Sequence, residues 1–110
     1  MKIGILCAIP NEIKYFDLNL NLARKIGGRL FFRKKEKSHE LILVECGIGK
    51  VNAAIVSTLL IQEFGCKLLI FSGIAGAIDP ELKIGDVIVG ESFIQYDYGA
   101  IVKGQFQIYR

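Results

Sequence analysis

Three things are scarce in this 110-residue sequence, and each absence narrows what the chain can be. No apolar run reaches the roughly 18 residues of a membrane-spanning helix, so we do not expect a membrane protein. The formal net charge is only +3, and the basic cluster at residues 33–37 is short and interrupted by an acid. Nucleic-acid binding is therefore not expected. One histidine and three cysteines without C-x-x-C spacing do not provide a zinc site.

The N-terminus and the cysteines predict a compartment. The apolar run at residues 2–8 is broken by Pro10, Asn11 and Glu12 and has no small-residue cleavage site. It therefore predicts a buried strand and not a signal peptide. The cysteines are odd in number and are interpreted as small core residues in a reducing compartment. Together these features predict a cytoplasmic protein with no metal and no cofactor.

The apolar periodicity predicts an α/β chain. Strands are expected at residues 2–8, 30–33, 40–46, 68–72 and 87–95, helices at 10–18 and 51–64, and a hairpin at 100–109. The strand at 68–72 is expected to lie centrally, and Gly65 to end the second helix. Strands this apolar need cover on both faces of the sheet, and two helices are too few for that. A second half, a partner subunit or an exchanged segment should supply the missing layer.

Two glycine turns follow strands. Residues 73–76 lie just past the carboxyl end of a strand, where open parallel sheets place their ligands. Small residues there let the backbone approach a ligand, although the turn could equally serve only to reverse the chain. Residues 47–49 form a second turn before a helix, a plausible place for a polar ligand group. The third glycine of a dinucleotide fingerprint is absent, because Asn52 occupies its position.

Glu12 lies in the first turn of the helix that follows the first strand. A carboxylate at that position interacts favourably with the helix dipole, which is a purely structural role. It could also act as an acid or base at the mouth of the sheet. Position alone favours the structural role.

Three segments in register resemble one family: MKIGILCAIPNEI, ECGIGKVNAAIVSTLL and SGIAGAIDPELKIGDVIVGE. They are similar to the purine nucleoside phosphorylase/uridine phosphorylase superfamily, and within it to the 5′-methylthioadenosine/S-adenosylhomocysteine nucleosidases. The later YDYGA is similar to the family's loop at a subunit interface. The resemblance implies the N-terminal half of a nucleoside-phosphorylase-like three-layer α/β/α fold with a mixed central sheet. Residues 1–110 would then be part of a single domain whose C-terminal half is absent.

The resemblance also implies an activity. This is hydrolysis of the N-glycosidic bond of an adenosine-type thioether nucleoside, releasing adenine in methionine salvage, by a homodimer. Glu12 would hold the attacking water. The implied substrate-binding residues are Ala8, Ile9, Ile48, Ile74, Ala75 and Gly76. The general-acid Asp and the adenine-binding residues would lie outside this chain, so the chain alone is expected to be inactive.

Departures from the family pattern bear on the reaction. Phosphorylases of the superfamily carry phosphate-binding arginines where this chain has Asn11 and Phe71, so water is the expected nucleophile. Ile74 stands where many members have Ser or Thr, and Cys7 replaces a common glycine. A futalosine-type hydrolase, or another nucleoside hydrolase or phosphorylase of this fold, therefore stays open. A further alternative is a truncated or split family member that is catalytically inactive and acts only by self-association.

Overall fold

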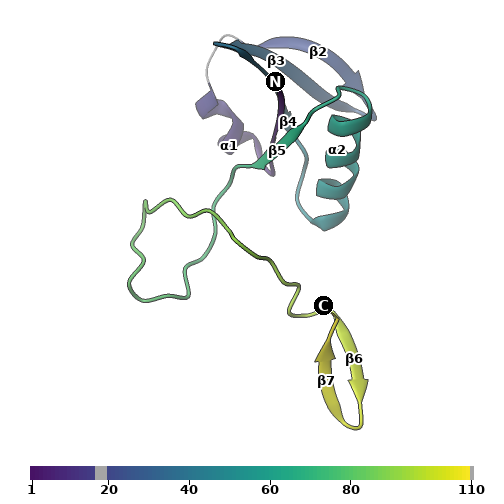
Figure 1. Ribbon diagram of the computed structural model, residues 1–110, viewed down its shortest axis with the longest axis vertical. Helices are drawn as coiled ribbons and strands as arrows, with labels where there is room; N and C mark the ends of the chain where they lie inside the picture. Colours follow the sequence, from purple (N-terminus) through teal and green to yellow (C-terminus); the bar gives the residue numbers. More distant parts are fainter. Residues whose placement is uncertain (17–19, 110) are drawn as a thin grey trace. The chain divides into compact units, whose positions relative to one another are not determined.

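The computed structural model describes residues 1–16 and 20–109, which form two compact units, Met1–Ala75 and Gly76–Arg110. The first unit carries a five-stranded sheet with helices, and the second carries a two-stranded hairpin (Figure 1). Each unit is described by itself. Within the described residues, no helix combines the length and the apolar character needed to cross a bilayer.

The sheet of the first unit is mixed. Its strands are β1 (Lys2–Cys7), β2 (Asn21–Ile26), β3 (Arg29–Glu36), β4 (His39–Glu45) and β5 (Leu68–Phe71), in the order β2-β3-β4-β1-β5. β1 pairs in parallel with both β4 and β5, whereas the β2–β3 and β3–β4 pairs are antiparallel. This confirms the predicted mixed sheet and the predicted hairpin between β3 and β4.

Helices cover both faces of this sheet, as Figure 1 shows. On one face, Ile5 and Cys7 of β1 pack with the segment formed by α1 (Pro10–Ile13) and the 3₁₀-helix η1 (Lys14–Phe16). On the other face, Leu6 packs against α2 (Lys50–Gln62). Successive residues of a strand point to opposite faces, so the apolar run of β1 fills both cores. The result is the layered arrangement expected for strands without polar alternation.

α2 ends where the sequence predicts. Gly65 has a φ of +67° and its N–H donates to the Ile61 carbonyl at 3.1 Å, an arrangement that favours glycine after a helix. The helix has apolar side chains on its outer side as well, and Val51 and Ile55 are exposed. An α-helix that is apolar all round is normally buried all round.

Two strand predictions were wrong. Residues 87–95 form no strand, and Val87 and Val89 are 92% and 93% exposed. β5 is an edge strand of the five-stranded sheet and not a central one, because no described strand pairs with its second edge. Residues 87–95 have no described strand beside them to pair with their N–H and C=O groups. A β-prone segment without such a partner gains little from an extended conformation.

Two further elements differ from the prediction. No strand was predicted where β2 lies. Four of its six side chains are exposed and it carries charge, and its pairing with β3 makes it a strand. The first helix was expected over residues 10–18, but α1 ends at Ile13 and η1 at Phe16. The last residues of that prediction, Asp17 and Leu18, lie outside the described residues.

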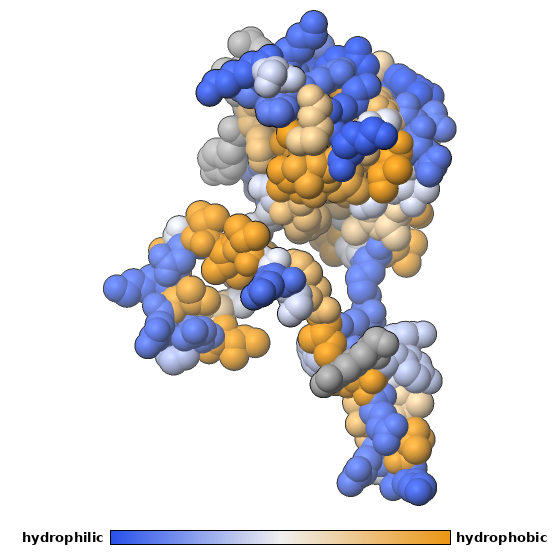
Figure 2. Space-filling view, in the orientation of Figure 1, coloured by the Kyte–Doolittle hydropathy of each residue, from blue (hydrophilic) through white to orange (hydrophobic). Residues whose placement is uncertain are grey.

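The second unit contains the predicted C-terminal hairpin, formed by β6 (Gly99–Val102) and β7 (Gln105–Ile108). Its turn places Lys103 and Gly104 at φ values of +51° and +78°, the pattern of a two-residue hairpin turn. The Tyr98 and Tyr109 rings meet edge to face, with centroids 5.2 Å apart. Most side chains of this unit are exposed, and Figure 2 shows apolar groups at the surface.

Candidate functional site

Glu12 is held at the start of α1, where the chain leaves β1. Its Oε2 accepts hydrogen bonds from the backbone N–H groups of Ala8, at 2.8 Å, and Ile9, at 3.2 Å. The bond from Ile9, the N-cap residue, is the contact by which a glutamate in the first turn secures a helix start. Glu12 therefore has a structural role through hydrogen bonds at the helix start, whereas its position in the sequence had suggested an interaction with the helix dipole. That role uses one carboxylate oxygen and leaves Oε1 for other contacts.

The chain after β5 passes very close to this carboxylate. The Ser72 N–H donates to the Leu6 carbonyl at 2.9 Å, which keeps the segment beside β1. A Cβ atom added at Gly73 would lie 3.1 Å from Glu12 Oε1 and 3.1 Å from the Phe71 ring. Both contacts are tighter than side chains normally make. Gly73 therefore allows the backbone to pass the carboxylate without displacing it.

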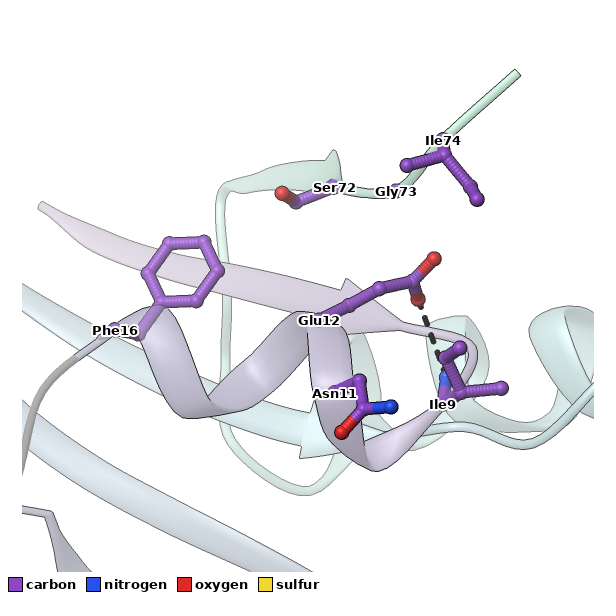
Figure 3. Close-up of a pocket in the computed structure, with 7 residues that line it drawn as sticks. All are labelled: Ile9, Asn11, Glu12, Phe16, Ser72, Gly73 and Ile74. Atoms are coloured by element: carbon purple, nitrogen blue, oxygen red, sulfur yellow. Dashed lines mark hydrogen bonds between the residues drawn. The ribbon is translucent and has the colours of Figure 1, made fainter. Parts of the chain in front are cut away.

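A cavity of about 610 Å³ opens at this point, past the carboxyl ends of β1 and β5. Figure 3 shows its lining, with Glu12 between α1 and the segment after β5. The lining residues are Ile9, Asn11, Glu12, Phe16, Ser72, Gly73 and Ile74. The cavity is of the size that small-molecule sites have, and it combines apolar walls with few polar groups. Among the described residues that line it there is no lysine and no arginine.

The cavity brings together some of the residues that the resemblance implied. Glu12, Ile9 and Ile74 line it, and Ala8 contributes its N–H to the Glu12 carboxylate. Ile48 is not in the lining; it lies in the 47–49 turn and is 77% exposed. Ala75 follows Ile74 and is also outside the lining, and Gly76 begins the second unit. Substrate binding by these six residues, and catalysis by Glu12, remain predictions.

Three cavity residues had no binding role in the sequence analysis. Asn11 was considered only as a non-cationic side chain, and Phe16 only as a member of the helix expected at residues 10–18. Ser72 was taken as the end of a strand. A signal for Phe16 was present, because it lies four residues after Glu12 and such residues share one side of a helical segment. Ser72 directly follows β5, where ligand-contacting residues of α/β sheets concentrate.

Cys7 lies next to the site but is not a nucleophile. It is fully buried at the end of β1. Burial, the nearby Glu12 carboxylate and Cys46 together raise the pKa of the Cys7 thiol to about 11. The thiol therefore stays protonated at neutral pH, and only the thiolate is reactive. Within residues 1–16 and 20–109, no three His, Cys, Asp or Glu side chains gather as metal ligands.

Comparison with known proteins gives a family match over nearly the whole chain. The family model described as "Phosphorylase superfamily" matches residues 2–107. The chain is 36% identical over 112 aligned positions to a 5′-methylthioadenosine/S-adenosylhomocysteine nucleosidase of Mycobacterium bovis, covering 100% of this chain and 44% of the relative. It is 40% identical to an aminodeoxyfutalosine nucleosidase of Campylobacter jejuni, covering 88% of this chain and 43% of that protein.

Solved structures agree with this match. The crystal structure of an S-adenosylhomocysteine nucleosidase from Streptococcus pyogenes, in complex with 5-methylthiotubericidin, superposes with a TM-score of 0.73 at 34% identity. The superposition covers 78% of this chain and 37% of that one. The superposed part of this chain has the fold of the corresponding part of that nucleosidase. The chain spans less than half the length of the relatives it matches.

Proposed function

Because the chain belongs to the phosphorylase superfamily, we propose that it forms the water- and ribose-binding side of a site that hydrolyses the N-glycosidic bond of a purine nucleoside. The observation that carries the proposal is the Glu12 carboxylate. Its Oε2 is fixed by two backbone N–H groups, and the carboxylate lines a cavity of about 610 Å³. Curated relatives of both kinds reported above are named as nucleosidases, which supports hydrolysis.

In the proposed reaction, Glu12 holds a water molecule against C1′ of the sugar. The water oxygen bonds to C1′ as the bond from C1′ to the base nitrogen breaks, and the electron pair leaves with the base. The base takes a proton from a general acid, and a water proton passes to the Glu12 carboxylate. The carboxylate also stabilises positive charge on the sugar ring, more strongly in an apolar cavity than in water. Its two N–H contacts fix its orientation before the substrate binds.

Residues 1–110 do not provide the whole of this machinery in the proposal. We assign the general acid and the base-reading residues to a part of the protein outside these residues, with both parts forming a single domain. An adenosine-type thioether nucleoside is the proposed substrate. A futalosine-type nucleoside is the second candidate, since the Campylobacter jejuni relative is named for it and Ile74 brings no hydroxyl into the cavity.

Hydrolysis can be separated from phosphorolysis by a direct test. A phosphate dianion calls for arginine or lysine side chains, and the part of the cavity lining that the structure describes contains neither. Adenine release from 5′-methylthioadenosine should therefore proceed at the same rate with and without phosphate, and yield the free sugar. The measurement is chromatography of both products from the enzyme that contains these residues. Strict dependence on phosphate, or a sugar 1-phosphate product, would overturn hydrolysis.

The proposed assembly is a cytoplasmic homodimer that buries the outer side of α2. Val51 and Ile55 are 74% and 44% exposed, and no charged side chain lies between Lys50 and Glu63. Burying such a surface would offset the cost of association. Sedimentation velocity should give a dimer, and Ile55→Lys should shift it to monomer. A monomeric wild type at micromolar concentration would count against this interface.

A further inference from the structure

Arg29 and Asn52 converge on the glycine turn at residues 47–49. Arg29 begins β3, and its Nη2 donates to Asn52 Oδ1 at 2.6 Å. Its Nε donates to the Cys46 carbonyl at 3.4 Å. Asn52, in the first turn of α2, donates from Nδ2 to the Ile48 carbonyl at 2.7 Å. Arg29 of β3 thus holds the Cys46 carbonyl, just before the turn, directly. It holds the Ile48 carbonyl, within the turn, through Asn52.

The turn needs support of this kind. Gly47 and Gly49 have φ values of +85° and +100°, and glycine is freer to leave any one conformation than other residues are. The N-cap position of α2 is Gly49, which has no side chain to secure the helix start. A second cavity, of about 620 Å³, lies beside the turn and is lined in part by Arg29, Gly47 and Asn52. Apolar packing does not fill that side, so polar contacts hold the backbone there.

The amide of Asn52 fits both its neighbours. It accepts from Arg29 and donates to the Ile48 carbonyl, which a carboxylate at the same position could not do. A Cβ atom added at Gly47 would lie 3.2 Å from Asn52 Nδ2, so the Asn52 amide lies close against Gly47. Arg29 presents two donors in a fixed plane, whereas lysine would offer a single point charge.

We propose that Arg29 and Asn52 are a positioning pair for the turn at residues 47–49. Through the turn they set the position of Ile48, which the family resemblance implies as a substrate-binding residue although it lies outside the cavity that Glu12 lines. The second statement rests on the proposed function, and the first does not. Neither side chain takes part in the bond-breaking chemistry assigned to Glu12.

The first test measures the turn itself, with no nucleoside present. Backbone ¹⁵N order parameters are compared between the wild-type chain and the variants Asn52→Asp and Arg29→Lys. In the wild type, residues 48 and 49 should have values near 0.85, typical of rigid backbone, and in the variants values below about 0.6. The strands β1 and β4 should stay rigid, which shows that the variants fold. A rigid turn in both folded variants would overturn the proposal that Arg29 and Asn52 position it.

Two matched controls are available, one within α2 and one between β2 and the end of α2. Thr58 Oγ1 donates to the Ala54 carbonyl at 2.9 Å, the same four-residue spacing as Asn52 to Ile48, but in the middle of the helix. Arg24 Nη1 contacts Glu63 Oε2 at 3.1 Å, at the opposite end of the helix. Thr58→Val and Arg24→Lys should leave the order parameters of the turn unchanged. A turn loosened equally by these controls would mean that α2 is sensitive everywhere, and would also overturn the pair.

The second test asks whether the turn matters to a substrate. In the enzyme assayed for adenine release, Asn52→Asp should raise KM several-fold while kcat stays within about twofold, because an Ile48 contact made equally before and during the reaction is lost. A loosened turn with unchanged KM would reject the contact between Ile48 and the substrate. If the wild type releases no adenine, the proposed function fails. The order parameters would still show whether Arg29 and Asn52 position the turn.

Discussion

Replacing Glu12 with Gln should lower nucleoside hydrolysis by roughly 10²–10⁴-fold, the usual contribution of a general base. The amide cannot take a proton from water or stabilise positive charge on the sugar. Its oxygen can still accept from the Ala8 and Ile9 N–H groups, so the helix start should survive. The measurement is kcat/KM for adenine release, with thermal unfolding recorded for both proteins.

The two roles considered for Glu12 give different outcomes in this experiment. If the carboxylate only secures the helix, Glu12→Gln should cost about 1 kcal/mol of stability or less and leave turnover almost unchanged. Glu91→Gln is a suitable control, since it removes an exposed carboxylate in the second unit. An active Glu12→Gln enzyme with an unchanged unfolding temperature would contradict the proposed mechanism.

Apolar runs with local end signals were predictable from the sequence. β1, β4 and α2 each carry such signals, and Gly65 ends α2 with the backbone angle that a terminating glycine adopts. β2 carries no such signal. It is mostly exposed, and its pairing with β3 shifts register between Leu22 and Arg24. Its strand character comes from hydrogen bonds with a neighbour, which periodicity does not report.

The same reason explains the strand that was predicted at residues 87–95 and is absent. The β-branched residues there are typical of a strand, yet among the described residues no other strand pairs with them. The sequence pattern records that the segment suits a strand. It does not record whether a neighbour is present to complete the hydrogen bonds.

The composition of the site depended on long-range pairing. Leu6 lies opposite Phe71 in the parallel register of β1 and β5, so the residues after both strands emerge at the same edge. That register places Gly73 against Glu12, which lies 61 positions earlier in the chain. The family resemblance pointed to Glu12, but only the register shows that Gly73 passes close beside its carboxylate.

Replacing Phe31 with Ala should destabilise the first unit by about 3–5 kcal/mol, the usual cost of deleting a buried phenylalanine ring. Phe31 is fully buried in the core between the sheet and α2. Its ring stacks on Phe64, just beyond the end of α2, with centroids 4.7 Å apart and planes 27° from parallel. The Arg24 guanidinium lies over the Phe64 ring, 5.6 Å from its centroid. The free energy of unfolding can be measured by urea titration followed by circular dichroism.

Phe93→Ala provides the matched control, because the Phe93 side chain is 89% exposed. It removes the same ring and should change stability by no more than about 0.5 kcal/mol. Domains are stable by only about 5–15 kcal/mol, so Phe31→Ala should remove a large fraction of the free energy of unfolding. Phe31→Leu fills most of the space and should fall between the two. Equal losses for Phe31→Ala and Phe93→Ala would mean that the contact between β3 and the end of α2 does not hold this face of the sheet together.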